Sequence, residues 1–146
     1  TDHCSFTLAQ KDMGREDFTK IPGGLPGVET RGELIYSYGV AKRRISAARM
    51  CRCLSENPAR LYGLFPRKGI LRPGSDADIV VYDPTLSHVI RAEDCVANVD
   101  YNPYEGFATV GGIRQVWLRG QLSVSEGKVL AETPAGRYMA RGKNSL

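Results

Sequence analysis

The sequence predicts a mixed α/β chain in which helices come first and β-strands follow. Apolar residues recur at helical spacing between residues 28 and 64, and after Pro66 the chain breaks into short apolar runs separated by turns. With 146 residues, of which 42% are hydrophobic, the chain has room for about one domain and an ordinary core. The change from helical spacing to short strand-like runs near residue 66 is the best candidate for a boundary between two parts of the chain.

The first part of the chain is expected to be a long loop followed by a helix. Residues 1–27 contain clustered Gly and Pro and show little periodicity, which is typical of a loop. Apolar side chains at helical spacing predict an amphipathic helix over residues 28–45. Gly39 is expected to kink or end this helix.

Two further helix starts can be read from capping residues. Ser46 can cap a second helix, because its hydroxyl can accept from an amide that the first turn leaves without a partner. Asn57 followed by Pro58 predicts the start of a third helix, which stops by Pro66.

The second part of the chain predicts strands. The apolar run between Asp78 and Pro84 is bracketed by residues that break regular structure, which is typical of a buried strand. Gly120 and the Glu126-Gly127 pair are expected to form turns. The predicted strands cover residues 78–84, 87–91, 113–119, 121–125 and 128–131.

The net charge of +4 is a mild basic excess that names no partner. Basic residues nevertheless gather on the predicted helices, and they are Lys42, Arg43, Arg44, Arg49 and Arg52. One interpretation is a non-enzymatic, β-rich interaction module that binds nucleic acid or an acidic protein through this Arg-rich helical face. The favoured interpretation is a solvated face or a subunit contact, because Tyr36 and Tyr38 lie on or beside the apolar stripe.

The composition also bears on location. No apolar run approaches the ~20 residues of a membrane span, and no export signal stands at the front of the sequence, so no membrane partner is expected. The four cysteines form no C-x-x-C pair and are expected to be buried, reduced thiols, which predicts a cytoplasmic protein. They are Cys4, Cys51, Cys53 and Cys95.

Few residues have the pattern of a reactive site. Asp2 followed by His3, at the mouth of a Gly-rich loop, is a place where a carboxylate can bind a metal and move a proton, although the spacing alone is a weak signal. His88 is the one other histidine, and no zinc-binding spacing is present, so no self-contained metal site is predicted. Asp76 and Asp78 are better explained as turn residues that accept from backbone amides than as paired acids.

Seven stretches together carry a family resemblance. They are Thr1–Phe6, Asp17–Pro22, Gly24–Glu29, Asn57–Leu64, Arg67–Gly69, Gly74–Val80 and Asp100–Gly106. Their order and spacing resemble the carboxyl-terminal third of the dihydropyrimidinase and D-hydantoinase family of cyclic amidohydrolases.

The resemblance implies a (β/α)8 barrel with a binuclear metal centre, beside a β-sandwich. A barrel takes ~250 residues, so this chain is expected to be the C-terminal remnant of a metal-dependent hydrolase barrel followed by part of a β-sandwich. Residues 1–65 would be the end of the barrel, with its last strand, substrate loop and closing helices. Residues 66–131 would belong to the sandwich, and residues 132–146 would form a C-terminal arm that reaches neighbouring subunits.

The resemblance also implies roles for two residues. Asp2 matches the family's catalytic aspartate, which binds one metal and shuttles a proton, whereas the position of His3 is not a metal ligand. The backbone around Gly23, where many members have Asn, matches the loop that hydrogen-bonds the substrate's imide. The other ligands, four histidines and a carboxylated lysine, belong to earlier barrel strands, so the binuclear zinc of the intact parent is not expected to be complete here.

The function expected from the resemblance is hydrolytic opening of dihydropyrimidine or hydantoin rings by the parent protein. The isolated chain is expected to be inactive. The expected partners are a small cyclic amide and, when the protein is intact, other copies in a homotetramer, with no nucleic acid. An exposed half-barrel would also present apolar surface, which favours self-association.

Overall fold

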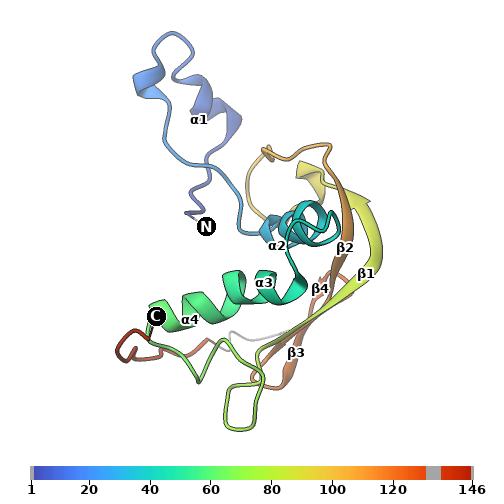
Figure 1. The fold of residues 1–146 in the computed structure, drawn as a ribbon. Coiled ribbons are helices and arrows are strands. Elements are labelled where there is room, and N and C mark those ends of the chain that lie inside the picture. The colour runs from blue at the N-terminus through green and yellow to red at the C-terminus, as the bar shows by residue number, and fades with distance from the viewer. Residues whose placement is uncertain (1, 131–135, 146) are drawn as a thin grey trace.

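The computed structural model describes residues 2–130 and 136–145. Figure 1 shows three parts of the chain: an N-terminal segment that projects from the rest, a run of helices, and a curved sheet formed by β1 and its neighbours. Helices precede residue 66 and strands follow it, so the predicted order of elements is confirmed.

The N-terminal segment is not the plain loop that the sequence predicts. It contains helix α1 (Leu8–Asp12) and a 3-10 turn at Phe18–Lys20. Thr7 caps α1 by accepting from the Gln10 amide, while the Gln10 side chain accepts from the Thr7 amide. This reciprocal pair is a capping box, and the Thr-x-x-Gln spacing in the sequence is the signal that was missed.

The first predicted helix forms over a shorter range than 28–45. Helix α2 (Arg31–Ile35) continues directly into a π-helical segment, Tyr36–Val40, that contains Gly39. The Ala41 amide donates to the Tyr36 carbonyl at 2.8 Å, five residues back, which widens the last turn. The irregularity expected near Gly39 is therefore confirmed.

The second predicted helix begins as expected, since the Ser46 hydroxyl accepts from the Arg49 amide at 3.1 Å and caps α3 (Ala47–Cys51). The chain then continues through a π-helical segment (Arg52–Glu56) into α4 (Asn57–Leu61).

The third helix, α4, begins at Asn57 and ends before Pro66 as predicted, but Asn57 does not cap it. Asn57 has helical dihedrals, φ −61° and ψ −45°, and its amide donates to the Arg52 carbonyl. Pro58 has no N–H to offer the preceding turn, and the helix accommodates this loss by the wider π-helical spacing instead of ending.

The strands form one antiparallel sheet in the order β1-β2-β3-β4. Their bounds are β1 Ile79–Val89, β2 Ala108–Leu118, β3 Gln121–Ser125 and β4 Lys128–Val129. The two strands predicted over 78–84 and 87–91 are a single strand, so that prediction is wrong. Pro84 is accommodated because β1 lies at the edge of this sheet and its register shifts between Asp83 and Ser87.

Strand β2 begins at Ala108, five residues before the predicted start. Gly111 lies in this part of the strand that was not predicted, and its φ of 77° lets the backbone approach two tyrosines. A Cβ at this position would lie 2.4 Å from the Tyr82 ring and 3.0 Å from the Tyr36 ring. These two rings pack with centroids 4.5 Å apart and join the end of α2 to the sheet.

The chain exposes far more surface than a compact protein of its size. Its accessible area is 10475 Å², against about 7,400 Å² for a folded monomer of 16.0 kDa. The buried core is small, with Ala59 and Ile90 at 6% and 2% exposure. Many large apolar side chains are open to solvent, among them Phe18, Leu71, Val96 and Val129.

The same openness corrects the cysteine prediction. Cys4, Cys51 and Cys53 are exposed and Cys95 is half-buried, and all four are unpaired thiols. The prediction of buried thiols is wrong for the first three, because the helices and loop that carry them pack on one face at most. Among the described residues, no helix is both long and apolar enough to cross a membrane.

The described part of the C-terminal arm returns to the end of α4. The Gly142 amide donates to the Gly63 carbonyl at 2.8 Å, and the Ser145 amide donates to the Arg60 carbonyl at 3.1 Å. Residues 132–135 and 146 of the predicted arm lie outside the described residues.

Candidate active site

The segment that carries Asp2 lies beside the Gly-rich loop. His3 and Leu25 form a parallel β-bridge, and the Cys4 amide donates to the Leu25 carbonyl at 3.2 Å. Gly24, with φ 130°, permits this approach, because a Cβ there would lie 2.4 Å from the Cys4 carbonyl oxygen. The fold thus brings Asp2 and Gly23 onto two paired segments, each within two residues of the bridge.

Asp2 is exposed and has φ 51°, in the left-handed region. Asp tolerates this conformation better than most residues, and such outliers gather at functional sites. An exposed carboxylate can bind a metal ion or accept a proton, so its setting is compatible with the role expected from the sequence.

His3 is oriented by the loop opposite. Its Nδ1 accepts from the amides of Gly27 and Val28 at 3.1 and 3.3 Å. In a neutral imidazole with Nδ1 as acceptor, Nε2 carries the proton and is a donor instead of a metal ligand. The geometry therefore gives His3 a structural task, to hold the loop against the Asp2 segment.

Lys11 fixes the loop on both sides of Gly23. Its ammonium donates to the carbonyls of Pro22 and Gly24 at 2.5 and 2.6 Å. Gly23 itself is exposed, and no atom lies within 4 Å of the position that a Cβ would take. Its main chain is accessible between two oriented carbonyls, as a substrate-binding backbone must be. The sequence alone gave no sign of the part that Lys11 plays.

The described residues supply little of a metal centre. Within residues 2–130 and 136–145 there is no group of three His, Cys, Asp or Glu side chains that could hold a metal ion. Asp2 offers one carboxylate donor, which suits a single position of a larger ligand set. No catalytic step through a metal follows from these residues by themselves.

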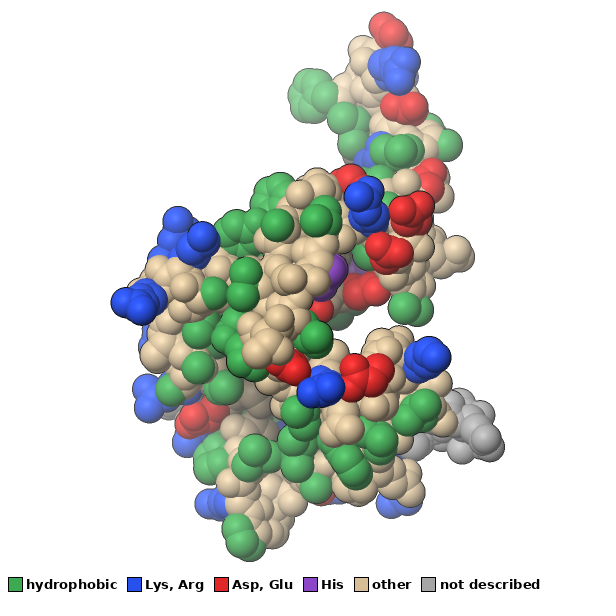
Figure 2. Space-filling model, turned by 90° about the vertical axis from the view of Figure 1, so that its right-hand side faces the viewer, with side chains coloured by type: hydrophobic (Ala, Val, Ile, Leu, Met, Phe, Trp, Pro, Cys, Tyr) green, Lys and Arg blue, Asp and Glu red, His purple; other side chains and the backbone are tan. Residues whose placement is uncertain are grey.

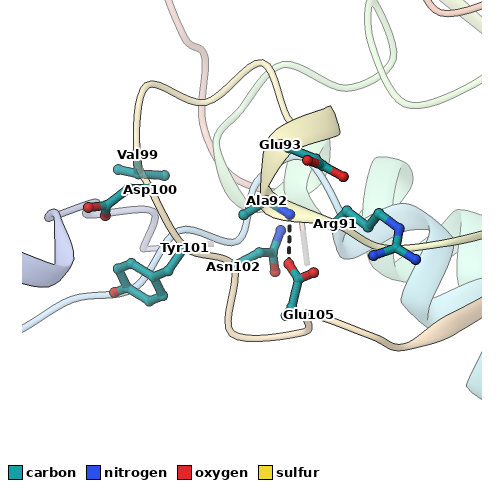
Figure 3. Close-up of a pocket in the computed structure, with 8 residues that line it drawn as sticks. All are labelled: Arg91, Ala92, Glu93, Val99, Asp100, Tyr101, Asn102 and Glu105. Atoms are coloured by element: carbon teal, nitrogen blue, oxygen red, sulfur yellow. Dashed lines mark hydrogen bonds between the residues drawn. The ribbon is translucent and has the colours of Figure 1, made fainter.

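Residues of the stretch Asp100–Gly106, together with Arg91–Glu93 and Val99, line a cavity of about 570 Å³, shown in Figure 3. The Glu105 carboxylate turns back to the Ala92 amide at 2.6 Å, the dashed line of Figure 3. Asp100 accepts from the Leu8 amide at 2.8 Å, which ties this loop to the first residue of α1. The Glu105 carboxylate thereby holds the loop to residue Ala92, and the Asp100 carboxylate holds it to the N-terminal segment.

Asp76 and Asp78 are engaged in structure. Both carboxylates pair with the Lys68 ammonium, and Asp78 also accepts from the Arg119 amide at 2.9 Å in the turn after β2. The hydrogen bond from Lys68 lowers the pKa of Asp76 below its ordinary value. The interpretation as turn residues holds for Asp78, while Asp76 pairs with cations instead of amides.

The Arg-rich helical face is exposed, but it lacks aromatic partners. Tyr36 packs on Tyr82, and Tyr38 packs edge-on against Phe107 with its hydroxyl donating to the Ala108 carbonyl at 3.0 Å. Both rings therefore pack on the sheet and its adjoining loop, and in that position they cannot stack on nucleic-acid bases. The interaction-module interpretation loses the feature that distinguished it from an ordinary charged surface.

Comparison with known proteins now identifies the class of protein. The sequence matches the amidohydrolase family over residues 22–123, most of the chain, and the chain belongs to this family. It is 43% identical over 142 residues to a D-phenylhydantoinase of Escherichia coli O127:H6, covering 97% of this chain and 31% of that protein. The chain thus spans about a third of the length of the curated relatives it matches.

Solved structures agree with this assignment. The chain superimposes in full on 32% of the dihydropyrimidinase from Brevibacillus agri NCHU1002, with TM-score 0.96 and 42% identity. It does so equally on 32% of the D-hydantoinase from a Bacillus sp. AR9, with TM-score 0.95 and 41% identity. The L-hydantoinase from Arthrobacter aurescens matches 90% of the chain and 29% of its own length, with TM-score 0.84 and 32% identity. The resemblance and the fold class predicted from the sequence are confirmed, and the alternative interaction module gains no support.

Proposed function

We propose that this chain is the carboxyl-terminal third of a metal-dependent cyclic amidohydrolase that opens dihydropyrimidine or hydantoin rings. The observation that carries the proposal is similarity along the whole chain, at 41–43% identity, to hydantoinases and a dihydropyrimidinase. The pairing of the Asp2 segment with the Gly23 loop supports it, because a proton-transfer group and an accessible backbone then lie on adjacent segments.

The proposed division of the chain follows the change from helices to strands. Residues 1–65 would belong to the end of the barrel, residues 66–131 to the β-sandwich, and residues 132–146 to an arm that contacts other subunits. The intact protein would be a cytoplasmic homotetramer. The exposed apolar surface supports this view, since a remainder of the protein and further subunits would cover it.

Asp2 would act both as a ligand and as the proton carrier. Two bound zinc ions, held by Asp2 and by ligands outside this sequence, would lower the pKa of water and supply a nucleophile at neutral pH. The Asp2 carboxylate would take the proton released when water adds to the ring carbonyl. It would return that proton to the ring nitrogen as the C–N bond breaks, so that one water is consumed for each ring opened.

Gly23 would position the substrate. Its main chain lies between the two carbonyls that Lys11 holds, and it is open to solvent. Amide hydrogen bonds from such a backbone would fix the imide of the ring and leave the carbonyl carbon facing the nucleophile.

A chimeric enzyme tests the proposal. The first two-thirds of the Escherichia coli D-phenylhydantoinase would be fused ahead of this chain, and hydrolysis of dihydrouracil and hydantoin would be measured with zinc present. We expect the chimera to be active and the isolated chain to be inactive, because the latter lacks the other metal ligands.

Matched variants of the chimera assign the role of Asp2. Asp2→Asn should lower kcat about 10³-fold, since the amide cannot carry the proton. Asp12→Asn removes an exposed carboxylate of α1 and should leave kcat unchanged. A fully active Asp2→Asn chimera, or turnover by the isolated chain, would contradict the proposal.

A further inference from the structure

The Gly23 loop lies in the N-terminal segment, which projects from the rest of the chain. In Figure 2 this segment stands out at the top of the molecule, and acidic, basic and hydrophobic side chains all lie on its surface. Contacts made within the segment therefore have a large part in setting the conformation of the loop. Among these contacts, the two hydrogen bonds from the Lys11 ammonium are the ones that flank Gly23.

Helix α1 carries Lys11 and is itself held at both ends. At its start the capping box is formed, and the Asp100 carboxylate accepts from the Leu8 amide at 2.8 Å. Just after its end Gly14 is buried against Ile21, and an added Cβ there would lie 2.1 Å from Ile21 Cγ1. The main chain of Lys11 is therefore fixed beside the start of the loop.

The Lys11 ammonium is bound by neutral groups. It donates to the Pro22 and Gly24 carbonyls at 2.5 and 2.6 Å, and it lies 5.2 Å from the centre of the Phe6 ring. Within the described residues no carboxylate forms an ion pair with it. A cation polarises the peptide group whose oxygen it binds, and this makes the N–H of the same peptide a stronger donor.

The planarity of the peptide group sets the direction of the Gly23 N–H. In a trans peptide the C=O and N–H bonds point in opposite directions, so the Pro22 carbonyl that faces Lys11 turns the Gly23 N–H away from Lys11. Pro22 and Gly24 are half-buried, whereas Gly23 between them is exposed. Among the described residues, no hydrogen bond uses the Gly23 N–H, so this donor remains available to a ligand.

We propose that Lys11 is a positioning residue for ring opening, which turns the Gly23 N–H toward an imide carbonyl of the substrate and strengthens that donor. This inference rests on the proposed function and adds a residue to which the family resemblance gives no role. The hydrogen bond from Gly23 is made to the bound ring both before and during the reaction. Lys11 therefore contributes to substrate binding much more than to the turnover rate of the bound complex.

The chimera described above tests this inference through kcat and KM for dihydrouracil, with zinc present. Lys11→Met removes the charge and should raise KM about tenfold, while kcat changes less than about twofold, because one donor to the substrate is weakened. Lys11→Arg keeps a cation with several N–H donors and should bring KM to within about threefold of the wild-type value. Lys20→Met, which removes a surface lysine paired with Asp17, should leave both constants unchanged.

The outcomes separate this inference from the proposed function. An inactive wild-type chimera contradicts the proposed function, and the inference falls with it. An active chimera in which Lys11→Met leaves KM unchanged, or lowers kcat by a larger factor than it raises KM, overturns the inference alone. Equal impairment of Lys11→Arg and Lys11→Met, or loss of bound zinc in Lys11→Met, also overturns it, since Lys11 would then support the fold of the site and not the direction of one donor.

Discussion

The segment that carries Asp2 and the joint between α2 and the sheet are held by different kinds of contact. The Asp2 segment is exposed, and hydrogen bonds from Lys11, to His3 and to Asp100 hold it in place. The joint packs Tyr36 against Tyr82 and buries polar groups between helix and strand. We infer that the joint carries the stability of the chain, whereas the site segment opens locally at a lower free energy.

The largest loss of stability is expected at Gly111, where the backbone of β2 comes closest to the tyrosine rings of the joint. Gly111→Ala places a Cβ 2.4 Å from the Tyr82 ring at a φ of 77°. Steric overlap and backbone strain together should lower the free energy of unfolding by about 3 kcal/mol. Urea unfolding followed by circular dichroism measures this loss.

Gly120→Ala is the matched control. Gly120 has a similar φ of 81°, but no atom lies within 4 Å of its added Cβ. It should therefore lose about 1 kcal/mol from backbone strain alone. Equal losses for the two variants would show that the tyrosine contact adds nothing, and the joint would not be the stable region.

A smaller loss is expected from Ser37→Ala. The Ser37 side chain, 3% exposed as a residue, donates to the Val110 carbonyl at 3.0 Å and accepts from the Val110 amide at 2.9 Å. Its removal leaves the Val110 amide without this acceptor and leaves the Val110 carbonyl with a long contact of 3.5 Å from the Tyr82 hydroxyl, and it should cost about 2 kcal/mol. Ser55→Ala, at an exposed helical position, should cost less than 0.5 kcal/mol, in the same unfolding measurement.

A pH-dependent contribution is expected from Glu33 in the same joint. Burial raises its pKa above the ordinary 4.5, although the charge of His88 and the Ile113 amide oppose this. The folded state therefore keeps a proton that the unfolded state releases, so this contribution is full below 4.5 and is lost as pH rises through the folded pKa.

Unfolding experiments between about pH 4 and pH 6 test this direction. The stability of the wild type relative to Glu33→Gln should fall as the pH rises, because the glutamine stays neutral throughout. A relative stability that is constant or rises over this range would show that Glu33 has no raised pKa.

The same contrast explains what the sequence could and could not predict. Ser46 was identified as a cap because capping depends on residues three apart, and the site that the family stretches predict for Asp2 and Gly23 stays a prediction, on segments that the structure pairs. The part of β2 that contains Gly111 was not predicted, since the close approach that requires a glycine there involves Tyr36 and Tyr82, which are distant in sequence.

Residues that act across long separations were missed for the same reason. Glu29 holds the Val96 and Ala97 amides of a distant loop, a role that no local pattern in the sequence indicates. Lys11 gave no signal at all, because its partners are backbone carbonyls, which every residue possesses. Periodicity and capping are local, whereas these anchors are created by the fold.

The smallest change in the free energy of unfolding is expected at Lys11, which holds the Gly23 loop beside the segment that carries Asp2. Lys11→Met removes the two bonds to the Pro22 and Gly24 carbonyls but disturbs no packed core. The free energy of unfolding should change by less than about 0.5 kcal/mol. Hydrogen exchange at the amides of Cys4, Gly27 and Val28, which bond across the two segments, should become about tenfold faster.

Lys20→Met provides the control, since Lys20 pairs on the surface with Asp17 and should affect neither measurement. If Lys11→Met instead lowered global stability as much as Ser37→Ala does, the site segment would belong to the cooperative core. The position of Asp2 would then be fixed by the fold as a whole. A purely local response means that the carboxylate is positioned by a few polar contacts, which further packing around this segment would strengthen.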